Sequence, residues 1–141
     1  MYLLDTDHMS LLQRGSEESR RIVARLRTLP PDDVAVTVIS FEEQTRGWLA
    51  HIAQQTATAN QVRAYDELKR LLQSYCFIAV VDFDSVAAEV FDRLRARYRR
   101  HGTMDLKIAA VALAQNATLV TRNVRDFGSV ADLRIDDWSV E

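Results

Sequence analysis

Tyr2-Leu-Leu-Asp-Thr-Asp7 is the stretch from which the fold of this chain is most directly inferred. Leu3 and Leu4 form a short apolar run that ends abruptly at Asp5, a pattern typical of a buried β-strand that emerges at a loop. In open α/β sheets, ligands bind outside the carboxyl ends of the strands. The stretch therefore predicts a buried strand with an acidic residue at the edge where a functional site would lie.

Short apolar segments and amphipathic helices alternate along the rest of the chain. Further strands are expected at residues 34–37, 77–81, 118–121 and 133–135, of which residues 77–81 make the strongest strand pattern because they are apolar and rich in β-branched side chains. Helices are expected over residues 57–74 and from starting points at Ser16, Ser40, Asp84 and Asp105. This alternation implies parallel pairing, with both sheet faces covered. We expect a three-layer α/β/α domain with a central parallel sheet.

The ends of two helices are also predicted by residue type. Pro30-Pro31 should stop the helix that Ser16 begins, and Gly102 should close the helix that Asp84 begins.

Length and composition indicate a single domain over residues 1–141. The chain has 141 residues, of which 48% are hydrophobic, which is one domain's worth of material. Its one cysteine, Cys76, excludes an internal disulfide framework or a Cys-rich zinc site, predicts a reducing compartment, and is expected in the core. The acidic start and the lack of a long apolar run predict a soluble, cytoplasmic protein without membrane association.

The charge of the chain is distributed unevenly. The net charge is −2, so the chain lacks the strong positive charge of a passive nucleic-acid binder. Five arginines nevertheless fall between Arg93 and Arg100. Arg93, Arg97 and Arg100 would form one stripe on a helix, and both a solvated face and contacts to RNA phosphates are compatible with it.

Acidic residues follow several of the expected strands. Asp5 ends the first strand, Glu43 lies shortly after the second, Asp105 begins a helix, and Asp126 follows residues 118–121. Each has a local explanation on its own: Glu43 completes a capping box with Ser40, for example, and acids favour a first helical turn. Their recurrence at one edge of the sheet favours a shared site.

A cluster of carboxylates needs a cation or protons. Two of them about 4 Å apart repel by roughly 4 kcal/mol at an effective dielectric constant near 20. Oxygen ligands without a Cys cluster or a His pair at ligand spacing favour Mg²⁺ or Mn²⁺ over zinc. Such an ion would attract a phosphodiester, lower the pKa of a bound water and neutralise the leaving oxygen, so hydrolysis is the chemistry expected.

Four motifs together resemble PIN-domain proteins, specifically the VapC-type toxins of bacterial toxin–antitoxin pairs. They are Tyr2-Leu-Leu-Asp-Thr-Asp7, Glu43-Gln-Thr-Arg-Gly47, Asp105-Leu-Lys-Ile-Ala-Ala110 and Leu119-Val-Thr-Arg-Asn-Val-Arg-Asp-Phe127. The resemblance implies a PIN-like fold and a metal-dependent endoribonuclease that acts as the toxin of a type II toxin–antitoxin system. It also implies inhibition by a cognate VapB-type antitoxin, an RNA substrate, a homodimer, and contact with DNA only through the antitoxin complex.

The resemblance also implies roles for individual residues. Asp5, Glu43, Asp105 and Asp126 match the four acids of the family and are predicted to be the catalytic metal ligands, with Asp5 and Asp105 the central pair. Glu42 and Glu43 cannot both face one site, because adjacent helical residues are rotated by about 100°. The resemblance favours Glu43, since its spacing from Gly47 follows the family pattern. The residues expected to support these acids are Thr121, Asn123 and Asp7, the last standing where the family more often has Asn.

Two other functions remain open at this point. The chain could be a PIN-like module that works mainly by binding the antitoxin and, through the complex, an operator. A phosphatase of the haloacid dehalogenase type is the third hypothesis, because a strand followed by Asp5-Thr-Asp7 imitates its nucleophile motif. That chemistry also needs a downstream lysine, and neither Lys69 nor Lys107 lies in a convincing sequence context for this role. His8 is expected to be exposed near a turn, and His101 has no partner at ligand spacing.

Overall fold

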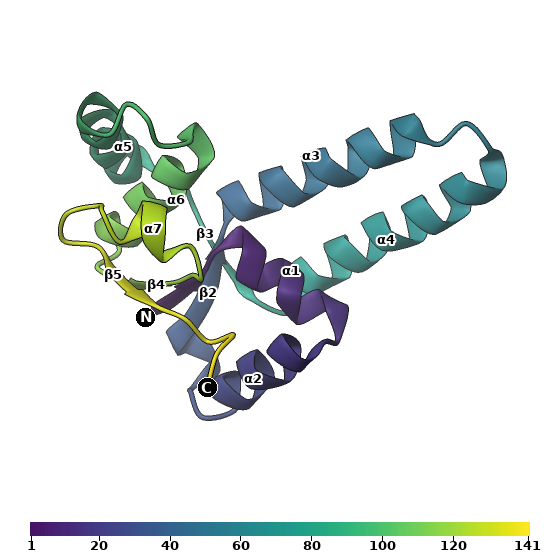
Figure 1. The fold of residues 1–141 in the computed structure, drawn as a ribbon, viewed down its shortest axis with the longest axis horizontal. Coiled ribbons are helices and arrows are strands. Elements are labelled where there is room, and N and C mark those ends of the chain that lie inside the picture. The colour runs from purple at the N-terminus through teal and green to yellow at the C-terminus, as the bar shows by residue number, and fades with distance from the viewer.

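Five parallel strands form the centre of the molecule in the computed structural model, which describes residues 1–141 (Figure 1). The strands are β1 (Tyr2–Leu4), β2 (Val34–Thr37), β3 (Ala79–Val81), β4 (Thr118–Val120) and β5 (Arg134–Asp136). Their order across the sheet is β3-β2-β1-β4-β5, and every neighbouring pair is parallel. The strand at the start of the chain is therefore the middle strand of the sheet.

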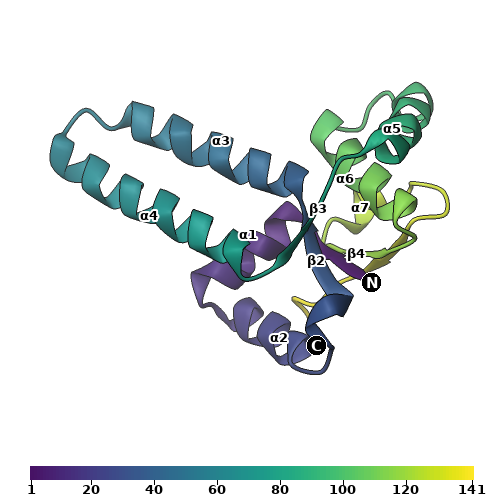
Figure 2. The same ribbon diagram turned by 180° about the vertical axis from the view of Figure 1, so that it is seen from behind.

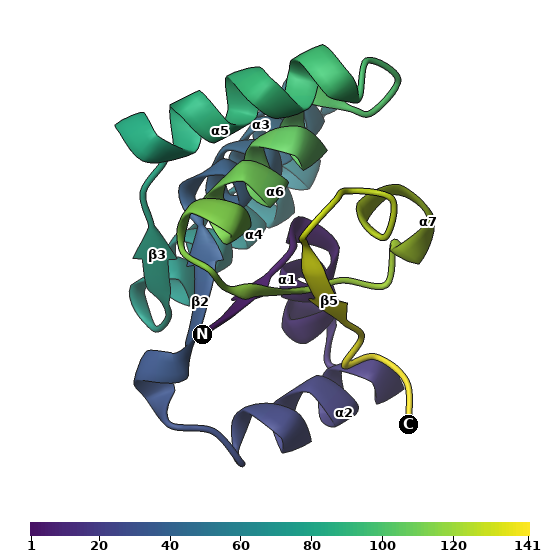
Figure 3. The same ribbon diagram turned by 90° about the vertical axis from the view of Figure 1, so that its left-hand side faces the viewer.

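Helices connect the strands and cover the sheet. They are α1 (Thr6–Arg14), α2 (Glu17–Leu26), α3 (Val38–Gln54), α4 (Thr58–Cys76), α5 (Ser85–Arg97), α6 (Thr103–Ala114) and α7 (Val124–Phe127), with a short 3-10 turn at Pro31–Asp33. Figure 3 shows α5 and α6 on one side of the strands and α2 on the other. This arrangement is the predicted three-layer α/β/α fold with an all-parallel sheet.

Alternation along the strands explains why both faces are covered. Leu3 and Leu119 belong to the core beneath α5 and α6, whereas Leu4, Val36 and Val120 belong to a second core against α1, α2 and the end of α4. Successive strand residues point to opposite faces, and here both sets are apolar and buried. The two cores are those of a sheet sandwiched between helical layers.

Helices α3 and α4 form an antiparallel hairpin that extends well beyond the sheet, as Figures 1 and 2 show from opposite sides. Near the sheet, the rings of Phe41 and Tyr75 pack edge to face, with their centroids 5.0 Å apart. This packed base fixes the direction in which α3 leaves β2.

Several boundaries differ from those that the sequence predicts. Helix α3 begins at Val38 rather than at Ser40, because the Thr37 hydroxyl caps it by accepting a hydrogen bond from the Ser40 amide at 3.2 Å. Gly102 does not close α5: Tyr98 is the C-cap of that helix, and Gly102 is the N-cap of α6. The capping box proposed for Ser40 and Glu43 is therefore wrong.

Strand β3 and the cysteine also differ from expectation. The strand covers only residues 79–81 of the predicted 77–81, and it is an exposed edge strand. Cys76 is exposed at the end of α4 instead of buried in the core. A β-rich composition identifies a strand but does not say whether it lies at the centre or the edge of a sheet.

The last residues of the chain return to α2, where the C-terminus lies in Figure 1. Trp138 is buried, and the guanidinium of Arg25 lies over its ring at 5.8 Å from the centroid. Arg21 donates a hydrogen bond to the main-chain oxygen of Ser139 at 3.0 Å. No helix of the chain combines the length and the apolar character needed to cross a membrane.

Two glycines give a matched stability test. A Cβ at Gly128 would collide with the main-chain oxygen of Val124, whereas a Cβ at Gly47 meets nothing within 4 Å. We expect Gly128→Ala to lower the free energy of unfolding by about 1–3 kcal/mol through steric overlap. Gly47→Ala, inside α3, should raise it by about 0.5–1 kcal/mol through helix propensity. Urea denaturation measures both, and equal effects would contradict the packing at α7.

Candidate active site

An acidic cleft opens at the carboxyl edge of the sheet, where β1 and β4 end. It has a volume of about 430 Å³ and combines side chains from α1, α3, α6 and the segment after β4. The residues that line it are Asp5, Thr6, Asp7, Ser10, Glu43, Asp105, Ile108, Asn123 and Phe127. Three of the four acids singled out from the sequence thus share one cleft, although they lie up to 100 positions apart in the chain.

Asp5 stands at the junction between β1 and α1. Its amide donates to the main-chain oxygen of Val120 at 3.0 Å, which extends the pairing of β1 with β4. Its carboxylate is the N-cap of α1, because Oδ1 accepts the amide proton of His8 at 2.7 Å. The side chain is almost entirely buried, with 4% of the residue exposed. A buried carboxylate at a helix N-terminus is stabilised by the helix dipole and by the capping bond.

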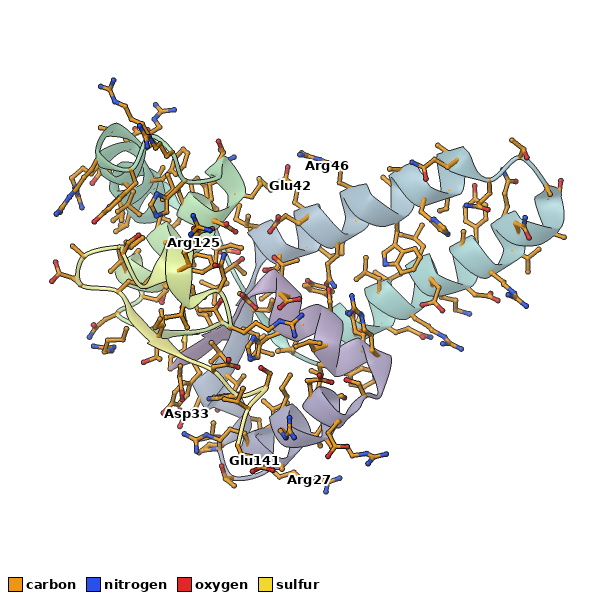
Figure 4. All side chains as sticks on the ribbon, in the orientation of Figure 1. Arg27, Asp33, Glu42, Arg46, Arg125 and Glu141 are labelled. Atoms are coloured by element: carbon orange, nitrogen blue, oxygen red, sulfur yellow. The ribbon has the colours of Figure 1, made fainter.

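Glu43 reaches the cleft from the second turn of α3. The Thr6 hydroxyl donates to its Oε1 at 2.7 Å and also lies 3.0 Å from Oγ of Ser40. Glu42 instead forms an ion pair with Arg46, and Figure 4 shows both of these side chains on the outer side of α3. The structure therefore brings Glu43, and not its neighbour, to the acidic cleft.

Asp126 is held by the turn that begins α7. Asn123 is the N-cap of this helix: its Oδ1 accepts the Asp126 amide at 3.3 Å, and its Nδ2 donates to Oδ2 of Asp126 at 3.2 Å. The buried Thr121 hydroxyl accepts the Asn123 amide at 3.0 Å. Thr121 therefore orders the turn through Asn123, and Asn123 contacts the acid directly.

Asp105 is the acid of the cluster whose charged form is most destabilised by its surroundings. Asp5, Glu43 and Asp126 each accept a hydrogen bond from the protein, but the half-buried carboxylate of Asp105 does not have such a donor. Desolvation raises the pKa of Asp105 above its ordinary value, and the negative charges of Glu43, Asp126 and Asp5 raise it further, against a smaller lowering by His101. This carboxylate gains most from a positive charge in the cleft.

The donor set suits a hard divalent cation, since the side chains that surround the cleft offer carboxylate, amide and hydroxyl oxygens. The acids do not, however, converge on one point: no three His, Cys, Asp or Glu side chains of the chain are close enough to hold one ion among them. Mg²⁺ characteristically keeps several waters and takes only one or two carboxylates from a protein. The wide spacing is compatible with such a site.

Asp7, predicted to support the acids, and the arginines predicted to contact RNA are arranged differently from expectation. Asp7 lines the cleft and forms an ion pair with Arg122, which does not line it. Arg93 and Arg97 are exposed on α5, but α5 ends at Arg97, so Arg100 lies beyond it and the predicted single helical stripe is wrong. The guanidinium of Arg97 instead lies over the ring of Tyr98, 5.3 Å from its centroid.

Sequence reasoning missed four residues beside the acids. Thr6 and Ser10 line the cleft, and Nε2 of His101 lies 3.0 Å from the main-chain oxygen of Asp126. His8, expected to be exposed, is fully buried next to Asp5. The one sequence signal for two of these residues was their spacing. Thr6 and Ser10 are four positions apart, so a helix that begins after Asp5 places both on the same face.

The fold and the cleft together define a class: an α/β/α protein with an acidic site at the carboxyl edge of a parallel sheet. Comparison with known proteins identifies the family to which this fold belongs. The family model described as PIN domain matches residues 2–133. This chain belongs to the PIN-domain family.

Curated relatives match part of the chain. It is 32% identical over 65 residues to Ribonuclease VapC2 of Rickettsia felis, covering 43% of this chain and 48% of that protein. It is 38% identical over 66 residues to the tRNA(fMet)-specific endonuclease VapC of Shigella flexneri, covering 44% and 50%. The matched region thus spans about half the length of these relatives.

A solved structure extends the likeness in fold to the whole chain. A toxin–antitoxin complex from Klebsiella pneumoniae contains a chain with a TM-score of 0.71 and 22% identity, and the match covers 98% of each chain.

The electrostatic strain at Asp105 predicts a stability change. A carboxyl group with a raised pKa in the folded state destabilises the fold once the pH exceeds the ordinary aspartate pKa. We therefore expect Asp105→Asn to raise the melting temperature of the metal-free protein at pH 7, with the gain disappearing toward pH 3. Glu42→Gln, which changes an exposed ion pair, should shift it little. A lower melting temperature for Asp105→Asn in EDTA would contradict the cluster.

Proposed function

We propose that this chain is a metal-dependent endoribonuclease of the VapC type and the toxin of a type II toxin–antitoxin pair. One observation carries the proposal: carboxylates from separate segments surround one cleft, and together with burial they raise the pKa of Asp105. A cluster of this kind is costly unless it binds a cation. The names of the curated relatives, which are a ribonuclease and a tRNA endonuclease, support RNA as the substrate class.

Asp5 and Asp105 are the proposed central ligands of a Mg²⁺ or Mn²⁺ ion, with Glu43 and Asp126 completing its surroundings. A bound divalent ion would supply Lewis-acid chemistry at a phosphodiester and a more acidic water. The chain itself orients the carboxylates: α1 fixes Asp5, Thr6 fixes Glu43, and Asn123 fixes Asp126. No side chain need serve as a nucleophile, since water suffices for phosphodiester hydrolysis.

The phosphatase alternative loses its support at three residues. Asp7, the second acid of the Asp5-Thr-Asp7 imitation, is engaged by Arg122. The ammonium group of Lys107 lies over the rings of Phe83 and Phe91, at 5.9 and 5.7 Å from their centroids, and so packs on aromatic side chains. Lys69 is exposed on α4, and neither lysine lines the acidic cleft.

We propose that the antitoxin binds an apolar groove beside the cleft. The groove has a volume of about 510 Å³, lies between α1, α2 and the start of β3, and is lined mainly by hydrophobic residues. Phe77, with 92% of its surface exposed, stands at its rim. A neighbouring hollow also includes Phe77 and extends to Ser10, which lines the acidic cleft as well. An antitoxin segment seated on Phe77 would therefore reach the acids.

Hydrogen bonds link the end of α4, where Ser74 lines the groove, with Ser10 of the cleft. The Tyr75 hydroxyl donates to Oε1 of Gln44 at 2.7 Å, and Nε2 of Gln44 donates to Ser10 at 2.8 Å. The proposed inhibition thus has a short structural route between the two surfaces.

Phosphate binding by Arg93, Arg97 and Arg100 remains a prediction that RNA crosslinking would test. A homodimer remains a prediction that sedimentation would test.

The nuclease proposal is tested at the acids. We expect Asp5→Asn and Asp105→Asn each to reduce Mn²⁺-supported cleavage of cellular RNA at least about 100-fold, because removing a ligand exceeds the usual cost of altering a ligand's partner. Glu42→Gln should retain activity, and EDTA should abolish it in the wild type. Growth arrest that persists in Asp5→Asn would favour the module that works only by binding its antitoxin and operator.

The groove is tested at Phe77. Phe77→Ser should weaken binding of the co-encoded antitoxin at least about 10-fold, since a well-seated aromatic anchor contributes 2 kcal/mol or more. RNA cleavage by the free protein should be unchanged. Val62→Ser, which alters an exposed apolar residue remote from the groove, is the matched control. Equal antitoxin affinities for the two variants, by calorimetry, would contradict this docking site.

A further inference from the structure

His8 lies directly behind Asp5 and is fully shielded from solvent, with 0% of its surface exposed. A polar ring in such a place should have its nitrogens satisfied. One nitrogen is: Nε2 receives the main-chain N–H of Trp138 at 3.2 Å. The other, Nδ1, is buried without a hydrogen-bond partner, while Oδ1 of Asp5 stands 3.3 Å away.

The bond to Trp138 determines which nitrogen of His8 carries the proton. An amide N–H can only donate, so Nε2 must act as the acceptor and be unprotonated. In a neutral imidazole the single proton then resides on Nδ1. The amide of Trp138 does not have another acceptor among the hydrogen bonds of the chain.

The nearby carboxylate of Asp137 does not reverse this assignment. Its Oδ1 lies 3.4 Å from Nε2 of His8, but it already accepts the amide and the hydroxyl of Ser139, at 2.8 and 2.6 Å. A proton on Nε2 would also face the N–H of Trp138, which would then have no acceptor. The two ring nitrogens thus have distinct neighbours, and only one tautomer suits both.

We propose that His8 is a positioning residue for Asp5: the main chain at Trp138 holds the proton of His8 on Nδ1, where it faces Oδ1 of Asp5. Oδ1 then accepts the amide of His8 at 2.7 Å and faces the Nδ1–H of the ring at 3.3 Å, so Oδ2, which has no protein donor, is the oxygen left for the cleft. This inference rests on the proposed function, in which Asp5 is a metal ligand. Partners that orient a ligand in this way commonly tune its affinity.

The C-terminal segment is thereby part of the site. Arg21 and Arg25 of α2 fix residues 138–139, and the indole N–H of Trp138 donates to Oδ2 of Asp136 at 3.0 Å. The segment is anchored independently of His8 and can therefore determine which nitrogen of the His8 ring carries the proton.

The tautomer is measured directly in the wild-type protein without metal. Long-range ¹H–¹⁵N correlation spectra of ¹⁵N-histidine-labelled protein distinguish the two neutral tautomers and the imidazolium. We expect the Nδ1–H form for His8 at pH 7, identified by the loss of its signals in His8→Asn. An Nε2–H ring, or an imidazolium, would overturn the proposal.

Two variants separate positioning from packing. The amide nitrogen of His8→Asn takes the place of Nδ1 and keeps a donor toward Asp5, whereas the oxygen of His8→Gln takes the place of Nε2 and keeps the acceptor for Trp138. We expect Mn²⁺ affinity, measured by electron paramagnetic resonance, to stay within about 3-fold of wild type in His8→Asn and to fall about 10-fold or more in His8→Gln. Equal affinities, or the reverse order, would overturn the proposal.

The outcomes also distinguish this inference from the proposed function. A wild type that shows the Nδ1–H ring but binds no Mn²⁺ would remove the metal-dependent function. A wild type that binds Mn²⁺ with an Nε2–H ring would remove the positioning role alone.

Discussion

Asp5 is attached both to the sheet, through its main chain, and to a helix, through its carboxylate. The arrangement of the site depends on this double attachment. Its amide continues the pairing of the central strand with β4, and its side chain begins α1. The cap requires the side chain to turn toward the helix, while the strand register fixes where that helix begins. Thr6, His8 and Ser10 inherit their positions from this junction.

Negatively charged carboxylates are concentrated around this junction. Three of the acids are each held by a donor from the protein, whereas Asp105 accepts none and bears the greatest cost. A charge cluster of this kind lowers the stability of the fold, and the same electrostatic origin would give it affinity for the proposed cation. The large apolar cores on both sheet faces make this cost tolerable.

Local pattern predicted the sheet and much of the site, and non-local contacts account for what it missed. A short apolar run and its abrupt end located Leu3, Leu4 and Asp5, and the spacing of Glu43 from Gly47, which follows the family pattern, distinguished Glu43 from Glu42. The burial of His8 could not be inferred, because its partner Trp138 lies 130 positions away. Helix α1 was not predicted because its cap, Asp5, was considered only as a strand end and turn. The wide spacing of the acids depends on backbone geometry that no residue pattern encodes.

The order of the strands has a consequence for how the protein is made. Of these five strands, the one synthesised first is the middle one, yet its neighbour β4 leaves the ribosome more than a hundred residues later. Asp105, Asp126 and the Trp138 amide also follow Asp5 by a hundred residues or more, so a nascent chain lacks the assembled cleft until these residues have been synthesised. The topology therefore delays completion of the site until long after its first acid has been synthesised.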